Sequence, residues 1–204
     1  MALYIPLIFF SALFSKALTL TCYTCIPDIS GKCTQTQTTC QSRCGSLTTT
    51  VYLNGTKLNS SRMKTCADPI SCINGSMNYG SGRVTFNTQC CSVDLCNSNF
   101  APDLSQQPLN GKKCYTCADK NCSKTLPCEG TEDQCFTSTV VIDGNKVIQK
   151  GCSSKFFCGN NASRTLGRSD GYDMRCCDGN LCNSGQSMSV FFLLLVPLLF
   201  LHLL

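Results

Sequence analysis

A pattern of ten cysteines occurs twice along this chain, and it restricts the fold more than any other feature. Each copy opens with the letters CYTC and closes with two adjacent cysteines, four further residues and Cys-Asn-Ser. The closing segments read CCSVDLCNS at 90–98 and CCDGNLCNS at 176–184. The two copies use all 20 cysteines of the 204 residues. An even, repeated cysteine set indicates two related units held together by disulfides.

Each unit is too small to be stable through an apolar core alone. A domain of roughly 70–75 residues gains about 3–5 kcal/mol from its core, whereas one disulfide that closes a loop of about 25 residues contributes about 3–4 kcal/mol. Adjacent Cα atoms lie about 3.8 Å apart, which is too close for a disulfide. Cys90 and Cys91 must therefore bond to other cysteines, and a small ring such as Cys91–Cys96 is reasonable. Spacing leaves the remaining partners open.

The first residues resemble a secretory signal. Residues 3–14 are largely apolar, and Ser15-Lys16-Ala17 places small residues where a signal peptidase cleaves. This apolar run is shorter than the roughly 20 residues of a membrane-spanning helix. We expect residues 1–17 to be removed, with cleavage after Thr19 as the second choice.

The last residues are typical of a glycosylphosphatidylinositol (GPI) attachment signal. Residues 190–204 are apolar, but as a helix they would span about 22 Å of a bilayer core that is about 30 Å thick. A cluster of small residues, Asn183-Ser184-Gly185, and a short polar spacer precede them. This order favours lipid attachment over a spanning helix. We expect attachment at Asn183, with Gly185 as the alternative, and removal of residues 184–204 as a propeptide.

Export and lipid attachment together predict a protein on the extracellular face of the plasma membrane, where disulfides persist. A secreted protein is the alternative. The charge is mild, with 17 Lys and Arg against 12 Asp and Glu, and no basic run of five or more residues occurs. Nucleic acid is therefore not an expected partner.

The sequence does not favour catalysis. The one histidine, His202, lies in the segment expected to be removed, and bridged cysteines offer no thiol nucleophile. The carboxylates of Glu132 and Asp133 are expected to be solvated. The C-x-x-C pairs could start a zinc site, but in an exported chain disulfides are the better interpretation. We therefore expect no enzyme, no metal and no cofactor.

Two segments predict β-hairpins. Residues 46–66 place β-branched and aromatic runs around Asn54-Gly55, and residues 135–152 do the same around Asp143-Gly144. Sustained helical periodicity is missing from the sequence, so the predicted class is all-β. The stretch after the first copy has two prolines and little apolar content, as linkers do. The expected domains are residues 18–97 and 114–183, joined by a linker at 98–113.

The cysteine order, from C-x-x-C through the adjacent pair to C-x-x-x-x-C-N, resembles the three-finger domains of the urokinase receptor and lymphocyte antigen six family, called LU domains. The resemblance implies three β-fingers on a disulfide hub, in which Asn97 and Asn183 form hydrogen bonds. It also implies ten disulfides: Cys22–Cys44, Cys25–Cys33, Cys40–Cys66, Cys72–Cys90, Cys91–Cys96, Cys114–Cys135, Cys117–Cys122, Cys128–Cys152, Cys158–Cys176 and Cys177–Cys182.

Five sequons predict N-glycosylation at Asn54, Asn59, Asn74, Asn121 and Asn161. Glycans on the first and third of these would shield fingers of domain one and shift binding toward domain two. Finger two of domain two, TVVIDGNKVI at 139–148, has no sequon. Its alternating Val and Ile build a sheet, and Lys146, Lys150 and Lys155 could steer a partner.

These features predict a non-enzymatic, GPI-anchored surface protein that binds a protein partner through its finger loops, as a receptor, adhesion protein or modulator. A secreted inhibitor similar to two-domain phospholipase A2 inhibitors is the alternative, and an ion-channel modulator resembling neurotoxins is a third possibility. The resemblance does not extend to urokinase binding, because that receptor assembles its ligand cavity from three domains.

Overall fold

The computed structural model describes residues 19–28, 30–117, 122–142, 144–158 and 173–185. Strands dominate this part of the chain, so the all-β prediction is confirmed. Domain one contains β1 (Leu20–Thr24), β2 (Thr36–Cys40), β3 (Arg43–Leu53), β4 (Thr56–Ala67), the 3-10 helix η1 (Pro69–Ser71), β5 (Asn74–Asn78) and β6 (Gly82–Cys91). Domain two contains β7 (Leu109–Thr116), β8 (Lys124–Glu129), β9 (Gln134–Ile142), β10 (Asn145–Ser153), the 3-10 helix η2 (Lys155–Cys158) and β11 (Asp173–Cys177).

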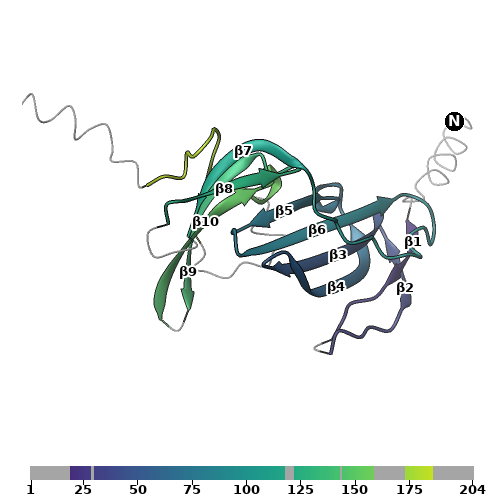
Figure 1. The fold of residues 1–204 in the computed structure, drawn as a ribbon. Helices are drawn as coiled ribbons and strands as arrows, with labels where there is room; N and C mark the ends of the chain where they lie inside the picture. Colours follow the sequence, from purple (N-terminus) through teal and green to yellow (C-terminus); the bar gives the residue numbers. More distant parts are fainter. Residues whose placement is uncertain (1–18, 29, 118–121, 143, 159–172, 186–204) are drawn as a thin grey trace, which may run out of the picture.

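The fingers of the two domains share one sheet. The first finger of each domain is a separate two-stranded sheet, β1–β2 or β7–β8, while the other strands form a seven-stranded sheet in the order β11-β9-β10-β5-β6-β3-β4 (Figure 1). The domains meet where β5 pairs with β10, with Asn78 opposite Cys152 and Met77 opposite Ser153. The sequence had suggested two units on a linker, without a continuous sheet.

Both predicted hairpins are present. Asn54 and Gly55 form the turn between β3 and β4 with positive φ angles of 49° and 79°. Such a turn follows the right-handed twist of the two strands, which explains why Asn-Gly occurs here. β9 and β10 pair along their whole length up to Ile142 and Asn145. Gly144 of that turn has a φ of 76°, while Asp143 lies outside the described residues.

Every cysteine is in a disulfide, and the ten pairs are those that the LU resemblance implies. The cysteines of each C-x-x-C pair bond to other cysteines and not to each other. Buried cysteines also make up the core of each disulfide hub. These are Cys22, Cys40 and Cys44 in domain one, and Cys114, Cys128, Cys135 and Cys152 in domain two. All of these are at most 1% exposed.

The segment between the domains is packed along domain one and is not a free tether. Ala101 is 1% exposed, and its carbonyl oxygen accepts a hydrogen bond from Thr48 Oγ1 of β3. Four residues further along β3, Tyr52 donates from its hydroxyl to the Leu104 carbonyl at 3.1 Å. Alternate residues of β3 thus hold this connector (residues 98–108) on one face of the sheet.

The expected linker at 98–113 is too long. Strand β7 begins at Leu109, which lies opposite Glu129 of β8, and pairing resumes at Lys113 opposite Pro127. An irregularity between these two pairs contains Gly111, whose φ is 87°. The bulge allows β7 to pair with β8 five residues before the first cysteine of the second copy, which composition alone did not indicate.

Asp103 fixes the middle of the connector to the β3–β4 hairpin. Its Oδ1 accepts hydrogen bonds from Thr50 Oγ1 and Ser60 Oγ, both at 2.9 Å, and its Oδ2 pairs with the Lys57 ammonium. The Lys57 hydrogen bond is the largest cause that lowers the pKa of Asp103 to about 2, and the two hydroxyls act in the same direction. The connector is therefore held by a charge as well as by its backbone.

Because of this contact, the free energy of unfolding of domain one should depend on pH in the acid range. The folded pKa of Asp103 lies near 2 and the unfolded value near about 3.9, so its stabilisation is complete above about pH 4 and is lost as the pH falls toward 2. Asp103→Asn should cost at most about 1 kcal/mol at pH 7 and flatten the acid limb of unfolding. Urea titrations between pH 2 and 7 measure this. Asp68→Asn, at an exposed carboxylate, is the control, and equal acid limbs would contradict the prediction.

Candidate binding surface

The asparagine after the last cysteine of each copy ties the end of its domain to the hub. Asn97 accepts from the Tyr23 main-chain N–H at 2.9 Å and donates to the carbonyls of Tyr23 and Gly45 at 2.9 and 3.0 Å. Asn183 makes the corresponding bonds to β7 and β9 at 2.8–3.0 Å. Both side chains are buried, so they act as structural clasps and are not available to a partner.

The sequons that the structure describes lie on domain one. Asn54 is at the tip of its second finger, Asn59 is in β4 and Asn74 begins β5, and all three are exposed. Asn59 and Asn74 each accept a main-chain hydrogen bond through the side-chain oxygen, at 2.7 and 2.8 Å. A glycan attaches through the amide nitrogen, so these bonds are compatible with one. Asn121 and Asn161 lie outside the described residues.

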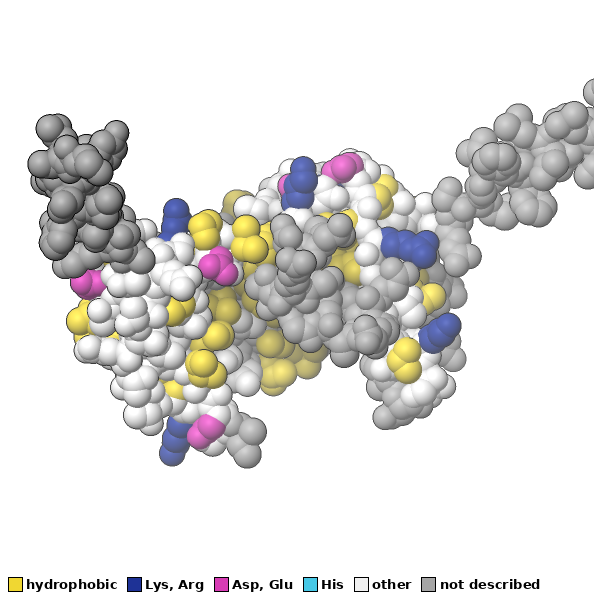
Figure 2. Space-filling model, turned by 180° about the vertical axis from the view of Figure 1, so that it is seen from behind, with side chains coloured by type: hydrophobic (Ala, Val, Ile, Leu, Met, Phe, Trp, Pro, Cys, Tyr) yellow, Lys and Arg dark blue, Asp and Glu magenta, His cyan; other side chains and the backbone are white. Residues whose placement is uncertain are grey.

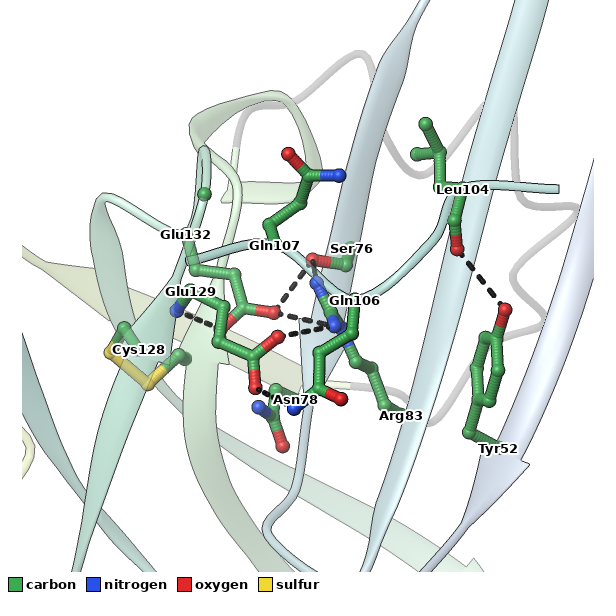
Figure 3. A network of polar contacts seen from close by, with 12 residues as sticks. Tyr52, Ser76, Asn78, Arg83, Leu104, Gln106, Gln107, Cys128, Glu129 and Glu132 are labelled. Atoms are coloured by element: carbon green, nitrogen blue, oxygen red, sulfur yellow. Dashed lines mark hydrogen bonds and ion pairs between the residues drawn. A yellow bond between two sulfur atoms is a disulfide. The ribbon is translucent and has the colours of Figure 1, made fainter. Parts of the chain in front are cut away.

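A buried ionic network joins the domains, and the expectation that Glu132 is solvated is wrong. Glu132 is 0% exposed, and its Oε1 accepts from Ser76 Oγ at 2.6 Å and lies 3.2 Å from Arg83 Nε (Figure 3). Arg83 also pairs with Glu129 at 2.6 Å. The turn between β8 and β9 packs against β5 and β6 of the other domain, which explains the burial. Asp133, next in the chain, is exposed as expected.

The network places two carboxylates around one guanidinium. Burial raises the pKa of Glu132, while the Ser76 hydrogen bond and the Arg83 charge oppose that rise. The side chains of Arg83 and Glu129 are each 13% exposed, so little water reaches this site. No sequence motif indicated it, because the partners come from strands that are far apart in the chain.

An apolar cluster lies on the other face of the same junction. Met77 of β5 packs with Phe136 of β9 and Phe157 of η2, which are at most 4% exposed. The Phe86 and Phe157 rings, one from each domain, are 4.8 Å apart between centroids. Figure 2 shows apolar side chains gathered near the middle of the molecule, where the domains meet. The two domains therefore share a core as well as a sheet.

The second finger of domain two carries an exposed, mixed surface. Thr139 of β9 lies opposite Ile148 of β10, and Val141 lies opposite Lys146, on the face away from Phe136. Val141 and Ile148 are 56% and 52% exposed. Figure 2 shows basic side chains beside apolar ones on this part of the molecule. Unburied aliphatic side chains next to cations are suited to contact with another protein.

A groove of about 390 Å³ continues this surface toward the hub. It is lined by Thr137, Thr139, Ile148, Lys150, Arg175, Cys176, Cys177, Cys182, Asn183 and Gly185. Lys150 Nζ donates to the Ser184 carbonyl at 3.3 Å, which fixes the C-terminal end of the described chain to the groove wall. Of the three lysines expected to steer a partner, Lys146 and Lys150 lie on this finger, and Lys155 lies in η2.

Within the described ranges, no helix has the length and apolar character needed to cross a bilayer.

Two family comparisons match nearly all of the described chain. Residues 18–99 match the sequence model of the u-PAR/Ly-6 domain, and residues 112–183 match that of snake toxin and toxin-like protein. The connector accounts for most of the gap between the two matches.

Curated relatives match in part. A urokinase plasminogen activator surface receptor from Aotus trivirgatus is 26% identical over 105 residues, which are 47% of this chain and 31% of that protein. An activin receptor type-1 from Rattus norvegicus is 36% identical over 80 residues, or 38% of this chain and 15% of that protein. The chain thus spans about a third or less of these relatives. A mouse TEX101 crystal structure matches with a TM-score of 0.26 and 13% identity, covering 80% of this chain and 99% of that one.

Proposed function

Because the chain belongs to the u-PAR/Ly-6 family, with two of its disulfide-rich domains in tandem, we propose that it is a non-enzymatic cell-surface protein that binds a protein partner through the β9–β10 finger. The observation that carries this proposal is the exposed pair Val141 and Ile148 beside Lys146 on a finger without a sequon. Aliphatic side chains that are more than half exposed on a rigid strand pair gain burial when a partner covers them.

Domain one offers less free surface for this role. The connector covers one face of its sheet through Thr48, Tyr52 and neighbouring side chains. Glycans proposed at Asn54, Asn59 and Asn74 would cover the tip and the other exposed strands of its fingers. Both features support domain two as the binding half.

The relatives support a protein as the partner, since their names describe receptors. The matched parts are a third or less of those receptors, so no individual ligand of theirs is assigned here. The family match also favours binding over catalysis, and all 20 cysteines are bridged, so no thiol is free for nucleophilic chemistry.

The mature protein proposed here lacks residues 1–17, keeps domain one and the whole of domain two from the start of β7 at Leu109, and carries a GPI lipid in place of the C-terminal propeptide. Asn183 and Gly185 are the two attachment candidates. Asn183 is 5% exposed and makes three hydrogen bonds, whereas Gly185 is exposed. The attaching enzyme must reach the peptide bond, so this difference supports Gly185.

Phosphatidylinositol-specific phospholipase C on intact cells distinguishes the anchored protein from the secreted inhibitor. Release of the protein from the surface supports the anchor. Protein found in the medium alone supports the inhibitor.

Proximity labelling on living cells tests the binding finger. Ile148→Asp should reduce capture of the partner at least tenfold, because it places a charge in the centre of the proposed contact. Leu58→Asp is the matched control, since Leu58 is 68% exposed at the corresponding finger of domain one. Loss of capture with the control and not with Ile148→Asp would assign binding to domain one instead.

A further inference from the structure

Three side chains form a straight row across three adjacent strands of domain two. Thr137 in β9 lies directly opposite Arg175 in β11 on one side and directly opposite Lys150 in β10 on the other. Directly opposite residues of antiparallel strands point to the same face of the sheet. The row therefore presents a hydroxyl between two cations, and all three residues line the groove.

The spacing of the row fits a small anion. Neighbouring strands are about 4.8 Å apart, so the Cα atoms of Arg175 and Lys150 are separated by about 10 Å, with Thr137 midway. Two long cationic side chains at that separation can both reach one tetrahedral oxyanion between them, and the threonine hydroxyl can also donate to it.

Other contacts in the groove leave donors for an anion. Lys150 uses one of its three N–H donors on the Ser184 carbonyl. Arginine has five N–H donors, so Arg175 can serve an anion together with another acceptor. Along the backbone of β11, Asp173 is in register with Thr139, two residues before Arg175.

The groove also lies where the chain leaves the domain. Asn183 and Gly185 are part of its wall, and these are the two residues proposed for lipid attachment. The first group beyond the attachment carboxyl of a GPI anchor is ethanolamine phosphate. A phosphodiester would therefore lie a few covalent bonds from a residue of the groove wall.

We propose that the groove binds phosphate, and that its occupant is the ethanolamine phosphate of the protein's own anchor, held by Arg175, Thr137 and Lys150. This inference rests on the proposed lipid attachment. It makes the anchor a docked group that sets how the domain stands on the membrane.

Phosphorus NMR of the full chain released by phospholipase C tests this directly, because the released protein keeps its ethanolamine phosphate. The phosphate resonance should be displaced from its position in the protease-derived anchor peptide, and 1 M salt should reverse the displacement. Lys150→Gln and Arg175→Gln should each abolish most of it. Lys124→Gln, at an exposed lysine of β8, should not change it. A resonance identical to that of the free peptide overturns the proposal.

A second arm identifies the source of the phosphate. If phosphatidylserine vesicles lose at least tenfold in affinity with Lys150→Gln while the anchor resonance is that of the free peptide, the groove serves phospholipid headgroups and the chosen occupant is wrong.

A third arm separates failure of the anchor from failure of the groove. A secreted form ending at Gly185 keeps every described strand and all ten disulfides, and it can be titrated with O-phosphoethanolamine. Binding that is at least fivefold weaker in Lys150→Gln supports the groove even if phospholipase C releases nothing. Equal affinity, or no binding, overturns the groove whatever the anchor experiment gives.

Discussion

Gly151→Ala is expected to open the sheet between the two domains. A Cβ atom at this position in β10 would lie 1.9 Å from the Asn78 carbonyl oxygen of β5 and 3.0 Å from a ring carbon of Phe136. The first contact is with main chain, so no side-chain rotation relieves it. The strands must separate, which breaks the hydrogen bonds that β5 and β10 exchange and exposes Met77 and its neighbours. We expect a loss of at least about 3 kcal/mol at the junction.

Hydrogen exchange measures this opening locally. The Ser154 amide, which donates to the Ser76 carbonyl at 2.9 Å across the junction, should exchange about 100-fold faster, since 1.4 kcal/mol is a factor of ten. Gly82→Ala is the matched control, because a Cβ there meets nothing closer than the Tyr52 carbonyl at 3.7 Å. Unchanged protection of Ser154 in Gly151→Ala would show that the shared sheet is not required.

Arg83→Met should cost about 3–5 kcal/mol, because it removes the cation from a buried network and leaves two carboxylates facing each other. Glu132 is fully buried, so no water can replace the lost cation there, whereas the side chain of Glu129 is 13% exposed. Arg62→Met is the control. Arg62 pairs with Asp103 at 3.8 Å and its side chain is 47% exposed, so its loss should cost less than about 1 kcal/mol.

The pH dependence of this variant follows from Glu132. Burial raises the folded pKa of Glu132, so the folded state binds a proton at this carboxyl more tightly than the unfolded state does. This proton binding stabilises the folded state at low pH, and the stabilisation is lost as the pH rises through the folded pKa. Without Arg83 this effect grows, and the deficit of Arg83→Met should be smaller at pH 5 than at pH 7.4. Adding Glu132→Gln should restore part of the stability at pH 7.4. A deficit independent of pH in denaturant titrations would contradict this account.

The features that the sequence predicted correctly are those set by local chemistry. Adjacent cysteines cannot bond to each other, which favoured the small Cys91–Cys96 ring, and Asn54-Gly55 fixes a hairpin because its φ values favour Asn and Gly. Each signal lies within a few residues of the structure that it determines. The all-β class follows from the same local patterns.

The junction could not be predicted because its parts are single residues from distant strands. Arg83, Glu132 and Phe157 look like ordinary strand or loop residues, and they acquire their role when β5 pairs with β10. The connector was misjudged because its composition resembles a linker, whereas its order comes from backbone groups that meet the hydroxyls of β3.

The groove was found in part from the sequence. Lys150 stood out as a cation on an unglycosylated finger, but Arg175 did not, because the row that joins them exists only once the register of three strands is known.

The seam at β5 and β10 also means that neither half is a self-sufficient module. A fragment containing β1–β6 would present β5 with an open row of backbone donors and acceptors, and a fragment containing β7–β11 would present β10 in the same way beside bare phenylalanine rings. Unpaired edge strands of this kind tend to form hydrogen bonds with strands of other molecules. A truncated or alternatively spliced product that lacks one domain is therefore expected to aggregate and to be poorly secreted, because each domain covers the exposed strand and apolar side chains of the other.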